Sequence, residues 1–267
     1  MIFNPDTVRD KVRLTAILVA ELSSAELDVV QNKFGLGANF CNPYPAEELF
    51  IHDRRSWSSH SHAAMMRAMS HIDPLLVIDA QTPHDGGIWY IEGFAEPIDV
   101  ETKQAENTNT LFKVRMKIED VVISYQNYSV ANTSIRDDMQ RVNIPFPIPE
   151  TFTQETLFTT GIDFIKERYT QSTWITATPD ELQTSTESSL LDRFLPRPEK
   201  VYRLPQDVAR ANGLKSSWTR GTLASLECGP GDEEGEVDGV REGSLVLQVE
   251  YDPKTVVPRY GRPEGSL

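Results

Sequence analysis

Cysteine, long apolar runs and basic residues are scarce in this sequence of 267 residues, and each scarcity excludes a class of protein. The two cysteines, Cys41 and Cys228, form no CxxC pair and lack metal-ligand spacing, which favours free thiols in a reducing compartment over a disulfide. The early apolar segment Leu14–Leu22 is interrupted by Thr15 and Glu21, and it is too short to span a bilayer. The N-terminal segment carries charges where a signal peptide has its apolar core. We therefore predict a soluble protein of the cytoplasm.

Basic side chains are outnumbered by acidic ones. Lys and Arg total 26, Asp and Glu total 40, and the formal net charge is −14. An acidic surface repels phosphate backbones and anionic lipids. We therefore predict neither a nucleic-acid partner nor a membrane partner, and the sequence leaves open whether the partner is a protein or a small molecule.

Complete catalytic and cofactor motifs are also absent. The sequence contains no GxxxxGK[ST] or GxGxxG run for nucleotide phosphates and no GxSxG elbow of a serine hydrolase. The sequence thus assigns no cofactor, and it does not decide whether the protein is an enzyme.

The strongest structural signal that is present lies in Pro74–Phe94. Leu75–Ile78 is an unbroken apolar run, which is typical of a strand buried on both faces. The Asp-Gly-Gly sequence at 85–87 offers the positive φ angles of a turn, and Ile88–Ile91 returns to strand-forming residues. These features predict a central hairpin.

Upstream of this hairpin, the sequence predicts a core strand over 13–21 and then a helix closed by Gly35. Ser23 and Glu26 have the spacing of a capping box. The apolar residues that follow are spaced three and four apart, as on one face of a helix: Leu27, Val30 and Phe34. A short helix over 46–50 and another from Ser58 or Ser59 to about His71 are also predicted.

Downstream of the hairpin, the residues 111–118 show the cleanest alternation in the chain. Apolar residues alternate with Lys113, Arg115 and Lys117, which predicts a strand with one solvated, basic face. A second strand over 121–125 and a short helix from Ile135 to Met139, capped by Thr133 or Ser134, are predicted next.

Two blocks of the first half resemble a domain family of unknown function. They are DPLLVIDA at Asp73–Ala80 and NYSVANTSIRDDM at Asn127–Met139. The resemblance covers about the first 140 residues. It implies a compact domain of mixed α and β structure and transfers no catalytic residue. The polar segment Glu96–Asn109 departs from the family's pattern.

The second half begins at the proline-rich segment IPFPIPE, which we interpret as an extended strap and as a domain boundary. The predicted domains are 1–143 and 144–267. Two strands, over 219–227 and 244–251, flank a predicted acidic loop at 229–243, and a flexible tail is predicted at 258–267. The predicted fold class is therefore α+β. A mixed, mostly antiparallel sheet with flanking helices precedes a smaller α+β region with a C-terminal β-hairpin.

All five histidines fall in one window, residues 52–84. Imidazoles and carboxylates are the usual ligands of zinc or iron, and an imidazole that titrates near neutrality also serves as a general acid or base. We predict His84 and Asp85 as catalytic candidates and His60 and His62 as metal-ligand candidates. Solvated or structural histidines are the stronger interpretation, because no HExxH or facial-triad spacing is present.

Two functions stay open at this level. The first is a non-catalytic binding or interaction protein that contacts a partner through the strap, the acidic loop and the tail. The second is a small-molecule enzyme, a hydrolase or lyase with or without a metal, whose site is His84 and Asp85. The first is favoured because no nucleophile, base and orienting group can be identified together.

Overall fold

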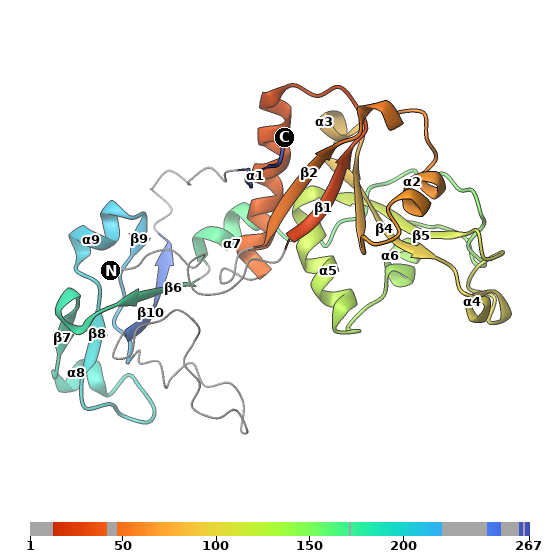
Figure 1. Ribbon diagram of the computed structural model, residues 1–267. Helices are drawn as coiled ribbons and strands as arrows, with labels where there is room; N and C mark the ends of the chain where they lie inside the picture. Colours follow the sequence, from red (N-terminus) through yellow and green to blue (C-terminus); the bar gives the residue numbers. More distant parts are fainter. Residues whose placement is uncertain (1–12, 42–46, 171, 221–244, 252–261, 264) are drawn as a thin grey trace. The chain divides into compact units, whose positions relative to one another are not determined.

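The computed structural model describes residues 13–41, 47–170, 172–220, 245–251, 262, 263 and 265–267 (Figure 1). These residues fall into two compact units, and each is described by itself. The larger unit contains the described residues up to 162 together with 262, 263 and 265–267, and the smaller unit contains those from 163 to 251. Cys228 and the predicted acidic loop at 229–243 lie outside the described residues.

The larger unit is built on a five-stranded mixed sheet. Its elements are β1 (Arg13–Leu18), α1 (Ser24–Cys41), β2 (Glu48–Asp53), η2 (Arg55–Trp57), α2 (His62–Ala68), β3 (Leu75–Ile78), α3 (Thr82–Asp85), β4 (Gly87–Phe94), α4 (Pro97–Glu101), β5 (Leu111–Lys117), η3 (Ile118–Asp120), α5 (Val121–Ser129) and α6 (Ile135–Arg141). The strand order is β2-β1-β3-β4-β5. β1 pairs in parallel with β2 and β3, whereas β3–β4 and β4–β5 are antiparallel.

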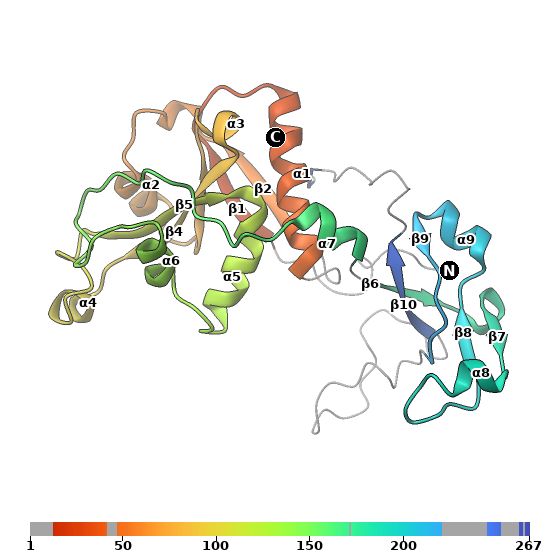
Figure 2. The same ribbon diagram turned by 180° about the vertical axis from the view of Figure 1, so that it is seen from behind.

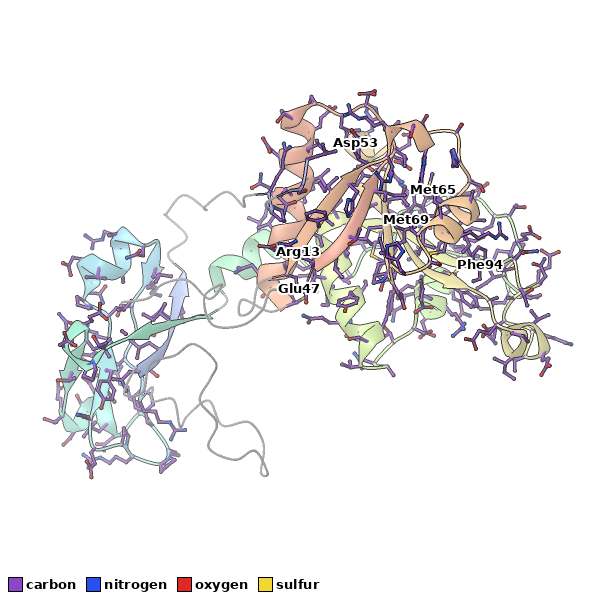
Figure 3. The ribbon with its side chains drawn as sticks, viewed as in Figure 1. Arg13, Glu47, Asp53, Met65, Met69 and Phe94 are labelled. Carbon is purple, nitrogen blue, oxygen red and sulfur yellow. The ribbon has the colours of Figure 1, made fainter. Side chains whose placement is uncertain are left out.

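Both faces of this sheet are covered, which explains why β3 is apolar at every position. On one face, α1, α5 and α6 pack over a core that includes Phe34, Leu76 and Met139 (Figures 1 and 2). On the other face, Met65 and Met69, at α2, pack against Leu75 and other residues of a second core (Figure 3). Flexible thioether side chains suit such irregular packing.

The smaller unit has its own core. Its elements are α7 (Phe164–Thr170), β6 (Ser172–Ala177), η4 (Pro179–Glu181), β7 (Gln183–Ser185), α8 (Ser188–Leu191), β8 (Val201–Arg203), α9 (Gln206–Ala211), β9 (Leu214–Lys215) and β10 (Leu245–Tyr251). β6, β10 and β9 form one antiparallel sheet, and β7 pairs with β8. The buried core includes Ile175, Leu204, Leu247 and Val249.

The predicted fold class is confirmed, because a mixed sheet with flanking helices precedes a smaller α+β region. Five of the seven ladders between described strands are antiparallel, including the pairs that β10 makes near the C-terminus. The predicted partner strand at 219–227 lies almost wholly outside the described residues. In the structure, the described residues 47–162 belong to one compact unit. Whether the chain folds as two separate domains divided at residue 143 stays a prediction.

The central hairpin is confirmed as β3 and β4, although its connection contains a one-turn helix, α3. The capping box before α1 is present, since the amide and hydroxyl of Ser23 both donate to Glu26 Oε2 at 2.7 Å. The helix continues to Cys41, past the predicted end at Gly35. The cap of α2 is Ser61, and its side chain accepts from the Ala64 amide.

Two predicted elements are wrong. The helix predicted over 46–50 is replaced by β2, because Glu48 to Asp53 pair with β1. The strand predicted over 121–125 is the start of α5, whose Val121 and Val122 are buried in the core shared with α1. The packing of these two valines against a helix outweighs the strand preference of β-branched residues.

Two segments far apart in sequence lie along the larger unit. The predicted strap is anchored by Ile148, which is completely buried and bridges to Ala105. At the end of the chain, the Leu267 amide donates to the Ile51 carbonyl of the edge strand β2, and Arg262 pairs with Asp28 at 2.6 Å. The described part of the predicted tail therefore contacts the unit.

None of the helices in the described ranges combines the length and the apolar character that crossing a bilayer requires.

Candidate functional site

The residues predicted to be catalytic, His84 and Asp85, lie in α3 between the two strands of the central hairpin. Asp79 organises this connection. Its carboxylate Oδ1 accepts from the backbone amides of Gln81 and Thr82 at 3.0 and 3.2 Å. Gly86, at φ 69°, ends α3 in the left-handed region, where glycine carries no steric penalty. The sequence thus forms a tight turn of helix at the carboxyl end of β3.

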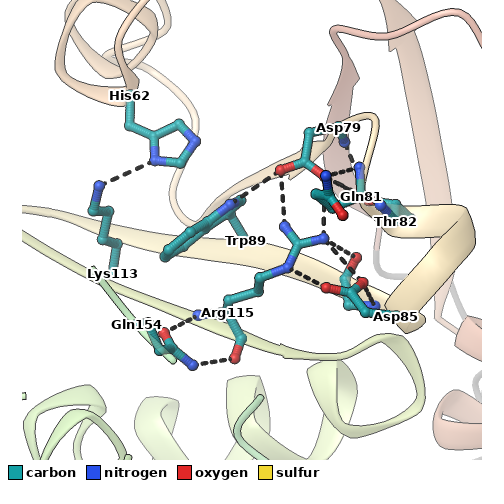
Figure 4. A network of polar contacts seen from close by, with 10 residues as sticks. His62, Asp79, Gln81, Thr82, Asp85, Trp89, Lys113, Arg115 and Gln154 are labelled. Carbon is teal, nitrogen blue, oxygen red and sulfur yellow. Dashed lines mark hydrogen bonds and ion pairs between the residues drawn. The ribbon is translucent and has the colours of Figure 1, made fainter. Parts of the chain in front are cut away.

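Arg115 of β5 joins both aspartates of this connection (Figure 4). Its Nη1 lies 2.8 Å from Asp79 Oδ2, and its Nε lies 2.9 Å from Asp85 Oδ2. The Arg115 residue is only 8% exposed. Trp89 of β4 also donates through Nε1 to Asp79 Oδ2 at 3.2 Å. We call Asp79, Asp85, Trp89 and Arg115 the arginine cluster. Its contacts connect α3 and the end of β3 with β4 and β5.

The electrostatics of the arginine cluster favour its charged form. Burial alone would raise the pKa of Asp85, but the hydrogen bonds from Arg115 and from the Gly87 amide outweigh it and hold that pKa below its usual value. Burial would also lower the pKa of Arg115, and its bonds to Asp85 and Asp79 outweigh it in turn. Asp85 is thus an ionised carboxylate that accepts hydrogen bonds at both oxygens.

The predicted solvated face of β5 is wrong for two of its three basic residues. Arg115 is buried in the arginine cluster, and Lys113 is half-buried between the rings of Trp89 and Phe152. Gln154 exchanges hydrogen bonds with the backbone of Arg115. The alternation was predicted correctly, but Asp79, Asp85 and Trp89 engage the side chains of that face, while the segment 152–158 bonds along the backbone edge of β5.

The predicted metal ligand His62 contacts Lys113 rather than another metal donor. Its Nδ1 lies 3.2 Å from Lys113 Nζ, and its ring packs edge-on to Trp89 at 5.0 Å (Figure 4). Burial, followed by the charge of Lys113, lowers the pKa of His62 to about 4. Burial likewise lowers the pKa of Lys113. His62 is therefore a neutral imidazole at pH 7, with a cation beside it.

The second predicted metal ligand, His60, is exposed and stacks on Trp57 at 5.7 Å. Across the described ranges, no group of three or more His, Cys, Asp or Glu side chains is placed to hold a metal ion. Metal binding by His60 and His62 stays a prediction that elemental analysis of the purified protein would test.

The other predicted catalytic residue, His84, faces a different feature. A half-open pocket of about 300 Å³ lies between α1 and α3, at the lower end of the volumes usual for ligand sites. We call it the α1–α3 pocket. Its lining is mostly apolar and comes from α1, α3 and the start of η3: Ala25, Glu26, Val29, Val30, Lys33, Thr82, Pro83, His84, Gly86 and Ile118.

The α1–α3 pocket contains two basic side chains without ion-pair partners. In the part of the chain that the structure describes, the side chains of Lys33 and His84 make no hydrogen bond or ion pair. Lys33 Nζ lies close to Gly86: a Cβ atom at position 86 would be 2.4 Å from this nitrogen. Glu26 lines the pocket too, but its Oε2 is held by Ser23.

The chain was compared with known proteins. No protein-family model, no curated protein and no solved structure matches it. The resemblance carried by DPLLVIDA and NYSVANTSIRDDM therefore has no family model in its support, and the function must be argued from the geometry alone.

The structure adds Lys33, Asp79 and Arg115 to the candidates His84 and Asp85 that the sequence singled out. Lys33 and His84 both line the α1–α3 pocket, and Arg115 pairs with Asp79 and Asp85. One signal was visible in the sequence. An aspartate directly after a buried strand marks a point where side chains from several elements converge. Nothing in the sequence indicated that Asp79, the aspartate after this strand, would pair with Arg115.

Proposed function

We propose that this protein is a non-catalytic binding protein and that its larger unit binds a small molecule in the α1–α3 pocket. The pocket itself supports the proposal: a half-open hollow of about 300 Å³ with mostly apolar walls and two basic side chains, Lys33 and His84, that form no ion pair within the described residues. A few polar groups among apolar walls are the usual composition of a small-molecule site.

The arginine cluster supports binding over catalysis. The hydrogen bonds from Arg115 and the Gly87 amide hold the pKa of Asp85 below its usual value, which makes this carboxylate a weaker general base. Both oxygens of Asp85 accept hydrogen bonds, Oδ2 from Arg115 and Oδ1 from Arg115 and the Gly87 amide. This carboxylate therefore braces α3, and α3 in turn supplies one wall of the pocket.

A hydrolase or lyase with His84 and Asp85 in its site is the alternative, and it is supported by the position of His84 in the pocket lining. The two proposals differ in what they require. Catalysis requires that Asp85→Asn abolish turnover of any substrate that is found, whereas binding requires only that the pocket keep its shape.

The binding proposal is tested by backbone amide chemical shifts recorded while a mixture of small fragments is added. We expect the shifts to concentrate on α1 and α3, including Val29, Lys33 and Gly86. Shifts that concentrate elsewhere, or no shifts at millimolar fragment concentrations, would contradict the proposal.

We also propose a cytoplasmic location and a partner other than nucleic acid or membrane. The formal net charge of −14 supports the statement about partners, since phosphate groups and anionic lipids would be repelled, and the scarcity of cysteine supports the location.

A further inference from the structure

From the lining of the α1–α3 pocket we infer that its ligand is a small carboxylate with an apolar body, held by Lys33 and His84. The inference rests on the proposed function and names the chemical class of its ligand.

The apolar body of the ligand is matched by the pocket walls. Val29 is 54% exposed although it lies on the helix that packs on the sheet. Pro83 is exposed on the facing element α3, and Ile118 is buried beside them. Covering exposed aliphatic surface stabilises a complex by roughly 25 cal/mol per Å² of area removed from water. An apolar ligand segment therefore gains binding energy here.

The carboxylate of the ligand is matched by the two basic side chains. Carboxylates already hold six arginines of the larger unit in ion pairs: Arg13, Arg55, Arg115, Arg136, Arg141 and Arg262. Lys33 and His84 line a pocket and form no such ion pair among the described residues, although the charge of His84 acts on the nearby carboxylate of Glu26. A carboxylate of the ligand is the complement that such basic side chains take.

Among the described residues of the lining Glu26 is acidic, and its carboxylate competes with the ligand at His84, whose charge acts on it. Its carboxylate caps α1 through the amide and hydroxyl of Ser23. It also precedes Lys33 by seven residues, which places the two backbone positions about 10 Å apart along a helix. Lys33 is not among the groups that act on the charge of Glu26, whereas His84 is, so Lys33 is the basic side chain of the lining that offers a ligand carboxylate an unengaged cation.

The inference is tested by titrating the full-length protein with three probes that share one apolar chain: hexanoate, hexanol and hexylamine. We expect hexanoate to bind about two- to fivefold more tightly than hexanol, the range expected of a partly exposed ion pair. This preference should shrink in Lys33→Gln and His84→Gln and remain in Lys103→Gln, which alters an exposed lysine outside the pocket.

The outcomes separate the inference from the proposed function. Equal binding of hexanoate and hexanol at the pocket would overturn the carboxylate and leave the binding function standing. Preference for hexylamine would overturn it as well and would identify Glu26 as the selecting group. If none of the three probes changes the amide chemical shifts of α1 and α3, both the carboxylate inference and the proposed binding function would be overturned. A hexanoate preference unchanged in both pocket variants would show that the two side chains are not the anchors.

Discussion

Arg115 is the residue on which the α3 connection depends. It is 8% exposed and holds Asp79 and Asp85, so its removal leaves the half-buried carboxylate of Asp79 and the more exposed one of Asp85 without a cation. We predict that Arg115→Met lowers the free energy of unfolding by about 3 kcal/mol, since breaking one side of a buried pair is costly. Urea unfolding followed by fluorescence measures this change.

Arg55→Met is the matched control for Arg115→Met. Arg55 also contacts two carboxylates, Asp53 and Glu21, but on the solvated surface. Exposed ion pairs contribute little to stability, so this variant should unfold close to the wild type. If the two variants lost the same free energy of unfolding, the burial of Arg115 would not explain the effect of Arg115→Met.

His62 should make stability depend on pH. Its pKa is 6.5 without the fold's influence and about 4 in the folded protein. Between pH 6.5 and about 4 the unfolded chain therefore binds more protons at this residue, and the folded state loses stability as the pH falls. We predict that His62→Gln loses about 2 to 3 kcal/mol less than the wild type between pH 7 and pH 4.

Chemical denaturation at a series of pH values measures this difference. His60→Gln, two residues away and exposed, is the control and should follow the wild-type profile. A His62→Gln profile parallel to the wild type would contradict the burial of a neutral imidazole at this site.

At the scale of the elements, the approach of α1 to η3 requires a glycine. A Cβ at Gly37 would lie 2.0 Å from the Glu119 carbonyl oxygen, a backbone atom that cannot rotate away. We predict that Gly37→Ala destabilises the protein by about 2 kcal/mol, because overpacking outweighs the roughly 1 kcal/mol that alanine gains in a helix.

Gly93→Ala in β4 provides the comparison, since nothing lies within 4 Å of a Cβ at that position. Its urea midpoint should stay close to the wild type. If Gly37→Ala were neutral or stabilising, the close packing of α1 on η3 would be wrong.

The elements differ in how far the sequence could predict them. The hairpin of β3 and β4 and the cap of α1 depend on neighbouring residues, such as Gly86 or Ser23 with Glu26, so local patterns were sufficient. β2 and α5 were mispredicted because pairing with β1 and packing with α1 decide their conformation. His84 was identified as a site candidate, but Lys33 and Arg115 acquire their roles only through contacts with distant segments.

At the scale of the whole molecule, the two units have separate hydrophobic cores. Multidomain chains need not unfold in one cooperative step. Leu247 is completely buried in the smaller unit and Leu76 in the larger unit. We predict that Leu247→Ala and Leu76→Ala each lower the free energy of unfolding of their own unit by about 2 to 5 kcal/mol. In differential scanning calorimetry, the two variants should therefore lower the midpoint temperatures of different transitions. A single transition that both variants lower together would mean that the units unfold as one.

If the α1–α3 pocket is a binding site, a probe molecule bound to the protein should lie in it. The measurement is the set of intermolecular nuclear Overhauser effects between methyl-labelled protein and hexanoate or hexanol. We predict contacts to the methyl groups of Val29, Val30 and Ile118, which line the pocket. Contacts confined to methyl groups of the smaller unit's core, such as Ile175 and Leu247, would contradict it.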